Sequence, residues 1–191
     1  MTEPHSTSLY SPAGRGILYI AEWSATTPPT DPDDYVQIGN CPSMEVEPTM
    51  ERRPHYSSQS GLRTRDLNPV VQTEYTLNFE CDEIAASNLQ RFFMGTLDAA
   101  SRTIAGLQRA DQEYALKFIS DNPIGPNQEY RFWRVTIGPS GPMQLIGDEY
   151  QQLSFTGEGL ADSANHVSSP YFDIKYITTT TTSTTTTTTT A

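Results

Sequence analysis

The chain contains few of the residues that build disulfide frameworks or metal sites. It has two cysteines, Cys41 and Cys81, and three histidines, His5, His55 and His166, among 191 residues. Two cysteines cannot form a disulfide framework; we expect two free thiols, with a single bridge between them as the alternative. No two of these five residues lie at metal-ligand spacing, so the sequence predicts no metal site.

Long hydrophobic runs are also missing. The longest apolar stretch, residues 17–21, has five residues, whereas a membrane-spanning helix needs roughly 20. The polar first eight residues do not resemble a secretory signal. We therefore expect no membrane anchor.

Positive charge is scarce as well, with 12 basic against 23 acidic residues and a formal net charge of −11. Such a chain repels phosphate, which argues against sequence-specific nucleic-acid binding and against anionic membrane surfaces. Ten Tyr, seven Phe and two Trp are enough to fill a core. The sequence predicts one domain over residues 1–177.

The last 14 residues, Thr178–Ala191, are twelve Thr, one Ser and one Ala. This segment cannot bury apolar area, and β-branched residues disfavour a helix. A surface tail without regular structure is the usual interpretation of such a tract. The alternative is an extended segment that adds to the edge of a sheet.

Basic residues are concentrated in one segment. From Arg52 to Arg65 there are four arginines and no carboxylate, whereas residues 66–191 hold 15 acidic and seven basic residues. This segment is polar, rich in turn residues and without period, which predicts a long exposed loop. Its charge fits an arm that binds an acidic surface, for which a second copy of this acidic chain is a candidate.

Most of the chain has the alternating pattern of β-strands. The clearest case is 71–81, where apolar and polar residues alternate over eleven positions, as expected for a strand with one buried and one wet face. One wet face is typical of antiparallel sheets. The other strands are predicted at Gly16–Trp23, Tyr35–Ile38, Ser43–Glu47, Gln112–Ile119, Glu129–Ile137, Met143–Ile146, Glu149–Gly157 and Tyr171–Ile177.

One helix is predicted between Asp82, as its N-cap, and Gly95, which is placed to end it. Its apolar positions 85, 89, 92 and 93 form a stripe suited to packing on a sheet. A second helical turn is expected near Asp98–Ile104. The predicted architecture is mainly β, an antiparallel β-sandwich or barrel with one packed α-helix.

No pattern assembles a catalytic site. Gly138–Gly141 lacks the spacing of a nucleophile elbow. Asp31–Asp34 lacks the glycine and terminal glutamate of a calcium loop. Tyr130–Arg134 interleaves aromatic residues with arginine, which is more simply a strand than a single-stranded nucleic-acid site. The sequence predicts no enzyme and no cofactor, and favours a structural or binding role.

The order of these features resembles the major tail tube proteins of long-tailed, non-contractile (siphovirus-type) bacteriophages. Each motif is structural, and the order and spacing over residues 10–177 carry the resemblance. The motifs are Gly39–Ser43, the acidic strand Met44–Glu47, the loop with Glu51–Arg53, His55–Ser58 and Ser60–Asp66, the alternating strand, Asp82–Gly95, Leu153–Asp162 and Ser169–Phe172.

The resemblance implies a structural virion protein, assembled in the host bacterial cytoplasm, that forms homohexameric rings. The rings stack into a hollow tail tube that houses the tape measure protein and conducts DNA into the host. Partners would include the tail terminator and distal tail proteins, and the subunit sheets would close into a barrel across the ring. The long loop, Glu51–Asp66, would reach the adjacent ring through Arg52, Arg53, His55, Arg63 and Arg65.

A lumen that passes DNA must be wetted without binding phosphate, so acidic and neutral polar side chains suit it. The polar faces of the two cleanest strands supply candidates. These are Gln72, Glu74, Thr76, Asn78 and Glu80 on one strand and Gln152, Ser154, Thr156 and Glu158 on the other.

Three alternatives remain. The inner tube of a contractile injection machine or a type VI secretion system shares the fold class. A carbohydrate-binding β-sandwich module would need exposed aromatic residues on one face and a signal peptide. A β-sandwich hydrolase would need a triad or a carboxylate dyad, and carboxylates contributed by separate strands could form one.

Overall fold

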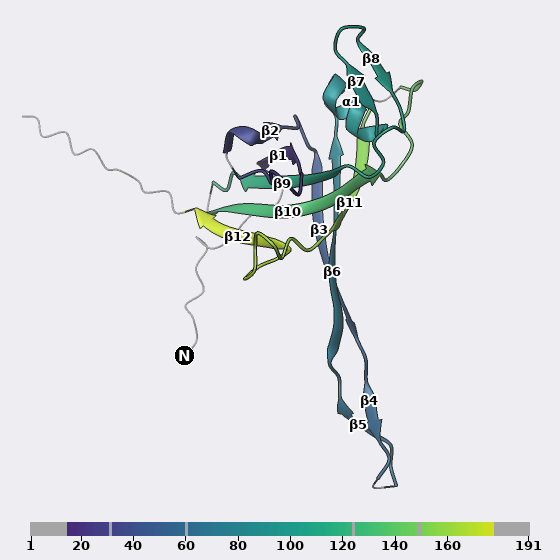
Figure 1. Ribbon diagram of the computed structural model, residues 1–191, viewed down its shortest axis with the longest axis vertical. Helices are drawn as coiled ribbons and strands as arrows, with labels where there is room; N and C mark the ends of the chain where they lie inside the picture. Colours follow the sequence, from purple (N-terminus) through teal and green to yellow (C-terminus); the bar gives the residue numbers. More distant parts are fainter. Residues whose placement is uncertain (1–14, 31, 60, 124, 149, 178–191) are drawn as a thin grey trace, which may run out of the picture.

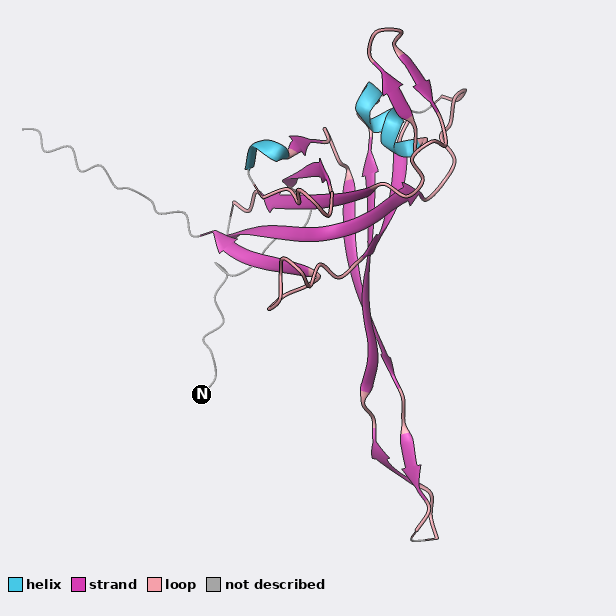
Figure 2. Ribbon diagram, in the orientation of Figure 1, coloured by secondary structure: helices cyan, strands magenta, loops and turns pink. Residues whose placement is uncertain are grey.

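The computed structural model describes residues 15–30, 32–59, 61–123, 125–148 and 150–177. Its main element is an antiparallel sheet of eight strands, ordered β2-β1-β9-β10-β11-β6-β3, with β12 paired to β10. One α-helix and two small hairpins accompany this sheet (Figure 1; Figure 2). The predicted class, mainly β with antiparallel pairing and one helix, is confirmed within the described residues.

Most predicted strands of the main sheet begin and end within two residues of the observed ones, but the predicted Glu149–Gly157 begins four residues before β11 and the predicted Ser43–Glu47 ends five residues before the end of β3. The predicted strand Met143–Ile146 is absent, since this part of the β10–β11 connection consists of bends and irregular backbone. The strands are β1 Gly16–Glu22, β2 Val36–Gln37, β3 Ser43–Arg52, β4 His55–Ser57, β5 Thr64–Leu67, β6 Val70–Cys81, β7 Thr96–Asp98, β8 Thr103–Ala105, β9 Glu113–Ser120, β10 Asn127–Pro139, β11 Leu153–Gly159 and β12 Phe172–Ile177, with a 3-10 turn at Pro32–Asp34.

The core lies on one face of β6, β11, β10, β9 and β1. The alternation in β6 buries Tyr75, Leu77, Phe79 and Cys81 as predicted. Phe79 stacks on Phe155 of β11, with 5.0 Å between ring centroids. Long strands with one apolar face therefore wrap around a shared aromatic and aliphatic centre.

The helix α1 spans Ala86–Phe92, which is shorter than predicted. Its N-cap is Ala85, without a side-chain capping bond. The predicted cap, Asp82, accepts a 2.6 Å hydrogen bond from Asn40 Nδ2 instead. The carboxylate therefore joins two loops and does not start the helix. Phe92 is buried, and α1 contacts β10 and β11, as its apolar stripe predicts.

The predicted helical turn at Asp98–Ile104 is wrong. This segment belongs to the hairpin of β7 and β8, with pairing from Thr96↔Ala105 to Asp98↔Thr103. The Asp98 carboxylate accepts hydrogen bonds from Ala100 N and Ser101 Oγ. Asp favours such local turn bonds over a helix interior, which explains the hairpin.

The predicted loop Glu51–Asp66 is also different in the structure, because much of it is strand. β3 and β6 pair from Ser43↔Glu80 to Arg52↔Val70, and β4 and β5 then continue the ribbon outward. Figure 1 shows this ribbon projecting far from the body, opposite α1 and the β7–β8 hairpin. The Thr-rich segment Thr178–Ala191 lies outside the described residues.

Candidate interaction surfaces

The projecting ribbon has almost no buried side chains. Between residues 48 and 74 every described residue is exposed except Ser57 and Asn68, which are half-buried. We call residues 48–74 the arm. Because an isolated two-stranded ribbon buries little apolar area, the arm gains little stability from its own packing.

The arm arginines have no carboxylate partner among the described residues. Four of the six body arginines pair with carboxylates at 2.5–2.9 Å, in Arg15–Asp121, Arg109–Glu22, Arg131–Glu129 and Arg134–Glu113. In the arm, by contrast, Arg52, Arg53, Arg63 and Arg65 form no ion pair with any residue that the structure describes. The positive charge predicted from the sequence is therefore both concentrated and uncompensated.

Local contacts hold three of these arginines along the ribbon. Arg52 donates to the carbonyl of Asn68 at 3.3 Å. Arg63 and Arg65 lie over the ring of Tyr56, with guanidinium carbons 4.9 and 5.8 Å from its centroid. These contacts orient the guanidinium groups without neutralising them.

His55, the remaining predicted arm residue, is the exception. Its Nδ1 lies 2.6 Å from Oδ1 of Asp66 across the β4–β5 pair. The hydrogen bond from His55 lowers the pKa of the Asp66 carboxyl. His55 therefore forms a hydrogen bond within the ribbon. It differs in this from the four arginines, none of which has a carboxylate partner among the described residues.

The arm also exposes apolar side chains. At its outer end Leu62 is 78% and Leu67 is 61% exposed. Nearer the body, Met50, Val70 and Val71 are exposed as well. Apolar and basic side chains side by side are typical of a surface that another molecule covers.

The predicted lumen residues lie together on the wet face of β6 and β11. The register places Glu80 beside Ser154, Asn78 beside Thr156 and Thr76 beside Glu158. Gln72 and Glu74 continue the row along β6 into the base of the arm. Gln152 precedes β11 by one residue and is exposed. Eight of the nine candidates therefore lie on the same face of the sheet formed by β6 and β11.

Strand β3 extends this face, which the sequence analysis missed because it ended the strand at Glu47. Its register places Glu45 beside Asn78, Glu47 beside Thr76 and Glu51 beside Gln72. The continued alternation of Val46, Pro48 and Met50 with polar residues was the available signal. We call the surface the acidic face: Ser43, Glu45, Glu47, Thr49, Glu51, Gln72, Glu74, Thr76, Asn78, Glu80, Ser154, Thr156 and Glu158, without a Lys or Arg among them.

A small apolar groove lies at the end of the molecule opposite the arm. It encloses about 300 Å³ between α1, the residues after β8 and the β10–β11 connection. Around it, Leu107 and Leu145 are 72% and 73% exposed. The sequence analysis did not predict this groove, whose residues come from three separate segments. It is lined by Phe92, Phe93, Met94, Leu107, Pro139, Gly141, Pro142, Met143 and Leu145.

Within the described part of the chain, no three His, Cys, Asp or Glu side chains gather in a way that could hold a metal ion. None of its helices has the length and apolar character needed to cross a membrane.

The comparisons with known proteins give one family. None of the curated proteins matches the chain. Among solved structures, it is similar to a chain of the sheath-tube complex of an extracellular contractile injection system, PVC, in the extended state. The identity is 6% and the TM-score 0.41, over 88% of this chain and 93% of that one. The family described as protein of unknown function UCP028589 matches residues 11–104 and 98–175. Since the two matched ranges of this family model together span most of the sequence, the chain belongs to that family.

Proposed function

We propose that the protein is the tube subunit of a tail-like particle, and specifically of a non-contractile bacteriophage tail. In this proposal homohexameric rings stack through the arms into a hollow tube that holds the tape measure protein and passes DNA. The proposal is based on the resemblance of the order of sequence motifs to that of tail tube proteins. It includes the expectation that the protein is not an enzyme.

The observation that carries the proposal is the arm. Its four arginines have no ionic partner in the described chain, although the whole molecule carries a net charge of −11. Like-charged subunits repel one another unless local charges are complementary. An arm that brings arginines onto an acidic neighbour supplies this complementarity.

The acidic face supports a role as the lumen wall. Its glutamates, threonines and amides bind water, and the absence of Lys and Arg leaves no cation to hold phosphate. Among the described residues, strand β3 ends the sheet and pairs with β6 alone. Its open edge is available to a neighbouring subunit, so a ring could close the sheet and remove the exposed edge.

The apolar groove is a suitable receiver for the arm of the next ring. The arm and the groove lie at opposite ends of the long axis (Figure 1). Identical subunits displaced along this axis would bring Leu62 of one copy to the groove of the next. Such a head-to-tail contact does not close on itself and so builds an open-ended stack.

Electron microscopy of the purified protein at high concentration and moderate salt tests the proposal. We expect hollow tubes or six-fold rings in negative stain. A protein that stays monomeric both alone and with the other tail proteins of its particle would contradict the proposal.

Reversing the arm charge gives a sharper test. In the variant with Arg52, Arg53, Arg63 and Arg65 changed to Glu, we expect an unchanged fold and no tube growth, because the four side chains are exposed. The matched control changes the same residues to Lys, which keeps the charge and should keep the tubes. Tubes of normal length from the Glu variant would refute a role of these arginines in stacking.

The inner tube of a contractile apparatus is the alternative assembly. It would use the same arm and the same acidic face, so tube formation does not separate the two. A sheath bound along the outer surface does. We expect tubes isolated from native particles to carry no sheath, and a sheath in those particles would favour the contractile assignment.

A further inference from the structure

The two cysteines lie beside each other at the end of the β3–β6 ribbon that is opposite the arm. Cys41 precedes β3 and is half-buried, and Cys81 is the last residue of β6 and fully buried. The neighbouring residues are locked together: Asn40 Nδ2 donates to Asp82 Oδ2 at 2.6 Å, and Asp82 N donates to the Asn40 carbonyl at 3.2 Å. The pairing brings two residues 40 positions apart in sequence into contact.

Polar groups surround the sulfur of Cys81. The amide of Asn88 donates to Cys81 Sγ at 3.4 Å, and the carbonyls of Ile38 and Glu83 lie at 3.6 and 3.5 Å. The hydrogen bond from the Cys41 thiol lowers the pKa of Cys81 to about 7, and the same bond raises the pKa of Cys41. Deprotonation near neutral pH therefore gives a thiolate on Cys81 that faces a thiol on Cys41.

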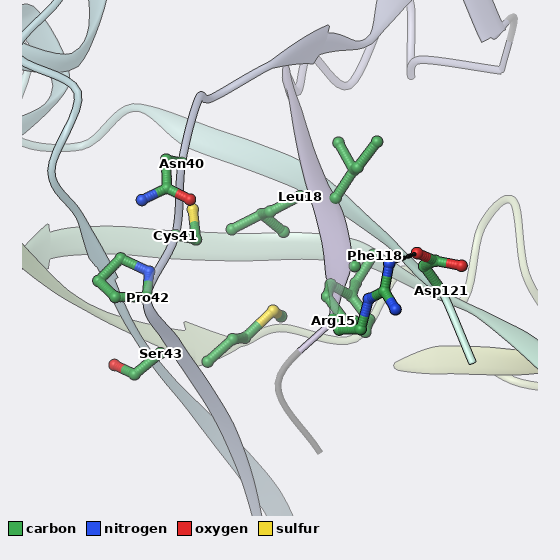
Figure 3. A pocket seen from close by; sticks show the side chains of 11 residues that line it. Arg15, Leu18, Asn40, Cys41, Pro42, Ser43, Phe118 and Asp121 are labelled. Carbon is green, nitrogen blue, oxygen red and sulfur yellow. Dashed lines mark ion pairs between the residues drawn. The ribbon is translucent and has the colours of Figure 1, made fainter. Parts of the chain in front are cut away.

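Small molecules have a route to Cys41. Its side chain lines a cavity of about 400 Å³ between the start of β1, the end of β9 and the segment before β3 (Figure 3). Leu18 and Phe118 form an apolar part of the cavity wall. The 2.9 Å ion pair of Arg15 with Asp121 forms another part of the wall. Cys81 is not among the lining residues. Solvent therefore reaches the Cys41 thiol through this cavity, whereas the Cys81 thiol is buried.

We propose that Cys41 and Cys81 are an oxidisable pair that a small disulfide converts into an intramolecular disulfide bridge. The Cys81 thiolate accepts the proton of Cys41 as Cys41 Sγ attacks one sulfur of the small disulfide R–S–S–R and expels R–S⁻, which then takes this proton from Cys81. The Cys81 thiolate then attacks Cys41 Sγ and expels the second R–S⁻. Two electrons pass from the two thiols to R–S–S–R, and their two protons go to the two R–S⁻ groups.

The bridge would close a loop that contains β3, the whole arm and β6. In a reducing compartment the two thiols stay free, whereas an oxidising one favours the bridge. A cross-link around this segment restricts the unfolded chain and keeps the body end of the β3–β6 ribbon paired. This inference goes beyond the proposed function and does not depend on tube formation.

Oxidised glutathione at pH 8 is the probe. After treatment of the full-length protein, we expect a mass loss of two hydrogens, no retained glutathione and one peptide pair linked through Cys41 and Cys81. For a loop of this length we expect the melting temperature to rise by about 5–15 °C, and to return when a reductant is added.

Two variants separate the steps. Cys81→Ala should stop after the first exchange and retain one glutathione on Cys41. Cys41→Ser should take up no glutathione, since Cys81 is buried, and its melting temperature should not respond to oxidation. Because Cys41 is only half-buried, this second variant keeps the test valid if Cys81→Ala does not fold. Two free thiols in the treated wild type, or cross-links only between chains, would overturn the proposal.

Discussion

Gly159, the last residue of β11, lies against the ring of Tyr75. A Cβ atom built at this position would overlap the ring carbons of that tyrosine. The ring cannot move away, because it is buried between Phe132, Tyr171 and Phe172. Sequence alone shows a Gly-x-Gly pair here and suggests a turn or bulge, but the glycine is required by the close approach of an aromatic side chain.

We therefore expect Gly159→Ala to destabilise the fold by about 1–3 kcal/mol through overpacking. Gly138→Ala is the matched control: it lies in the paired strand β10, and a Cβ there would meet nothing within 4 Å. Its effect should stay within about 1 kcal/mol. Urea unfolding of the two variants measures the difference, and equal midpoints would show that Tyr75 is free to yield.

Asn88 is a second residue whose role depends on distant partners. It is 1% exposed and its Nδ2 donates to the carbonyls of Ile38 and Glu83 at 2.7 and 2.9 Å. Its Oδ1 accepts from Arg91 Nη1 at 2.9 Å. Asn88 is not part of the apolar stripe predicted for the helix. Nothing in the neighbouring sequence indicates that its side-chain amide joins α1 to the ends of β2 and β6.

Asn88→Ala leaves the buried Ile38 carbonyl with only the weak thiol donor of Cys81, at 3.6 Å, and we expect a loss of about 1–3 kcal/mol. Asn78→Ala, on the exposed acidic face, is the comparison and should change stability by less than about 0.5 kcal/mol. Thermal or urea unfolding gives both values. A cost for Asn88→Ala as small as that for Asn78→Ala would mean that water replaces the amide.

At the scale of elements, the sequence predicted strands where one face is buried and failed where both faces are wet. The register of β6 follows directly from the burial of Tyr75, Leu77 and Phe79. The arm strands β4 and β5 have no core to alternate against, so residues 51–66 appear aperiodic. The pairing of β4 with β5 extends the β3–β6 ribbon. Because both faces of this extension are exposed, it produces no alternation of apolar and polar residues in the sequence.

The acidic face can be tested with a cysteine probe. In a Cys41→Ser background, Asn78→Cys gives one exposed thiol at the centre of this face. If the face lines a lumen, a bulky polyethylene-glycol maleimide should label free subunits at least tenfold faster than assembled tubes. A small maleimide serves as the control and should label both forms. Equal labelling of tubes by the bulky reagent would place the face outside.

At the scale of the whole molecule, composition and alternation were sufficient to predict the fold class and to locate a basic segment. They could not place that segment relative to other surfaces. The groove combines Phe93, Leu107 and Leu145, which are far apart in sequence. Only the folded chain separates the arm and the groove to opposite ends (Figure 1), and this polarity is the property on which directional stacking depends.

Polarity predicts how two defective variants behave together. Rings with Arg63→Glu and Arg65→Glu keep a working groove, and rings with Leu107→Asp and Leu145→Asp keep a working arm. Both pairs of residues are exposed, so both variants should fold. We expect neither to form tubes alone. When preformed rings are mixed, the arms of the second variant should enter the grooves of the first and give two-ring stacks, which end there because both outer surfaces are defective.

Negative-stain microscopy and sedimentation distinguish these outcomes by particle length. Self-complementary, face-to-face stacking would instead pair rings within each variant and gain nothing from mixing. Long tubes from the Leu107→Asp, Leu145→Asp variant alone would show that the arm binds elsewhere. Two-ring stacks found only in the mixture require one arm surface and one separate receiver on every subunit, since each variant then supplies what the other lacks.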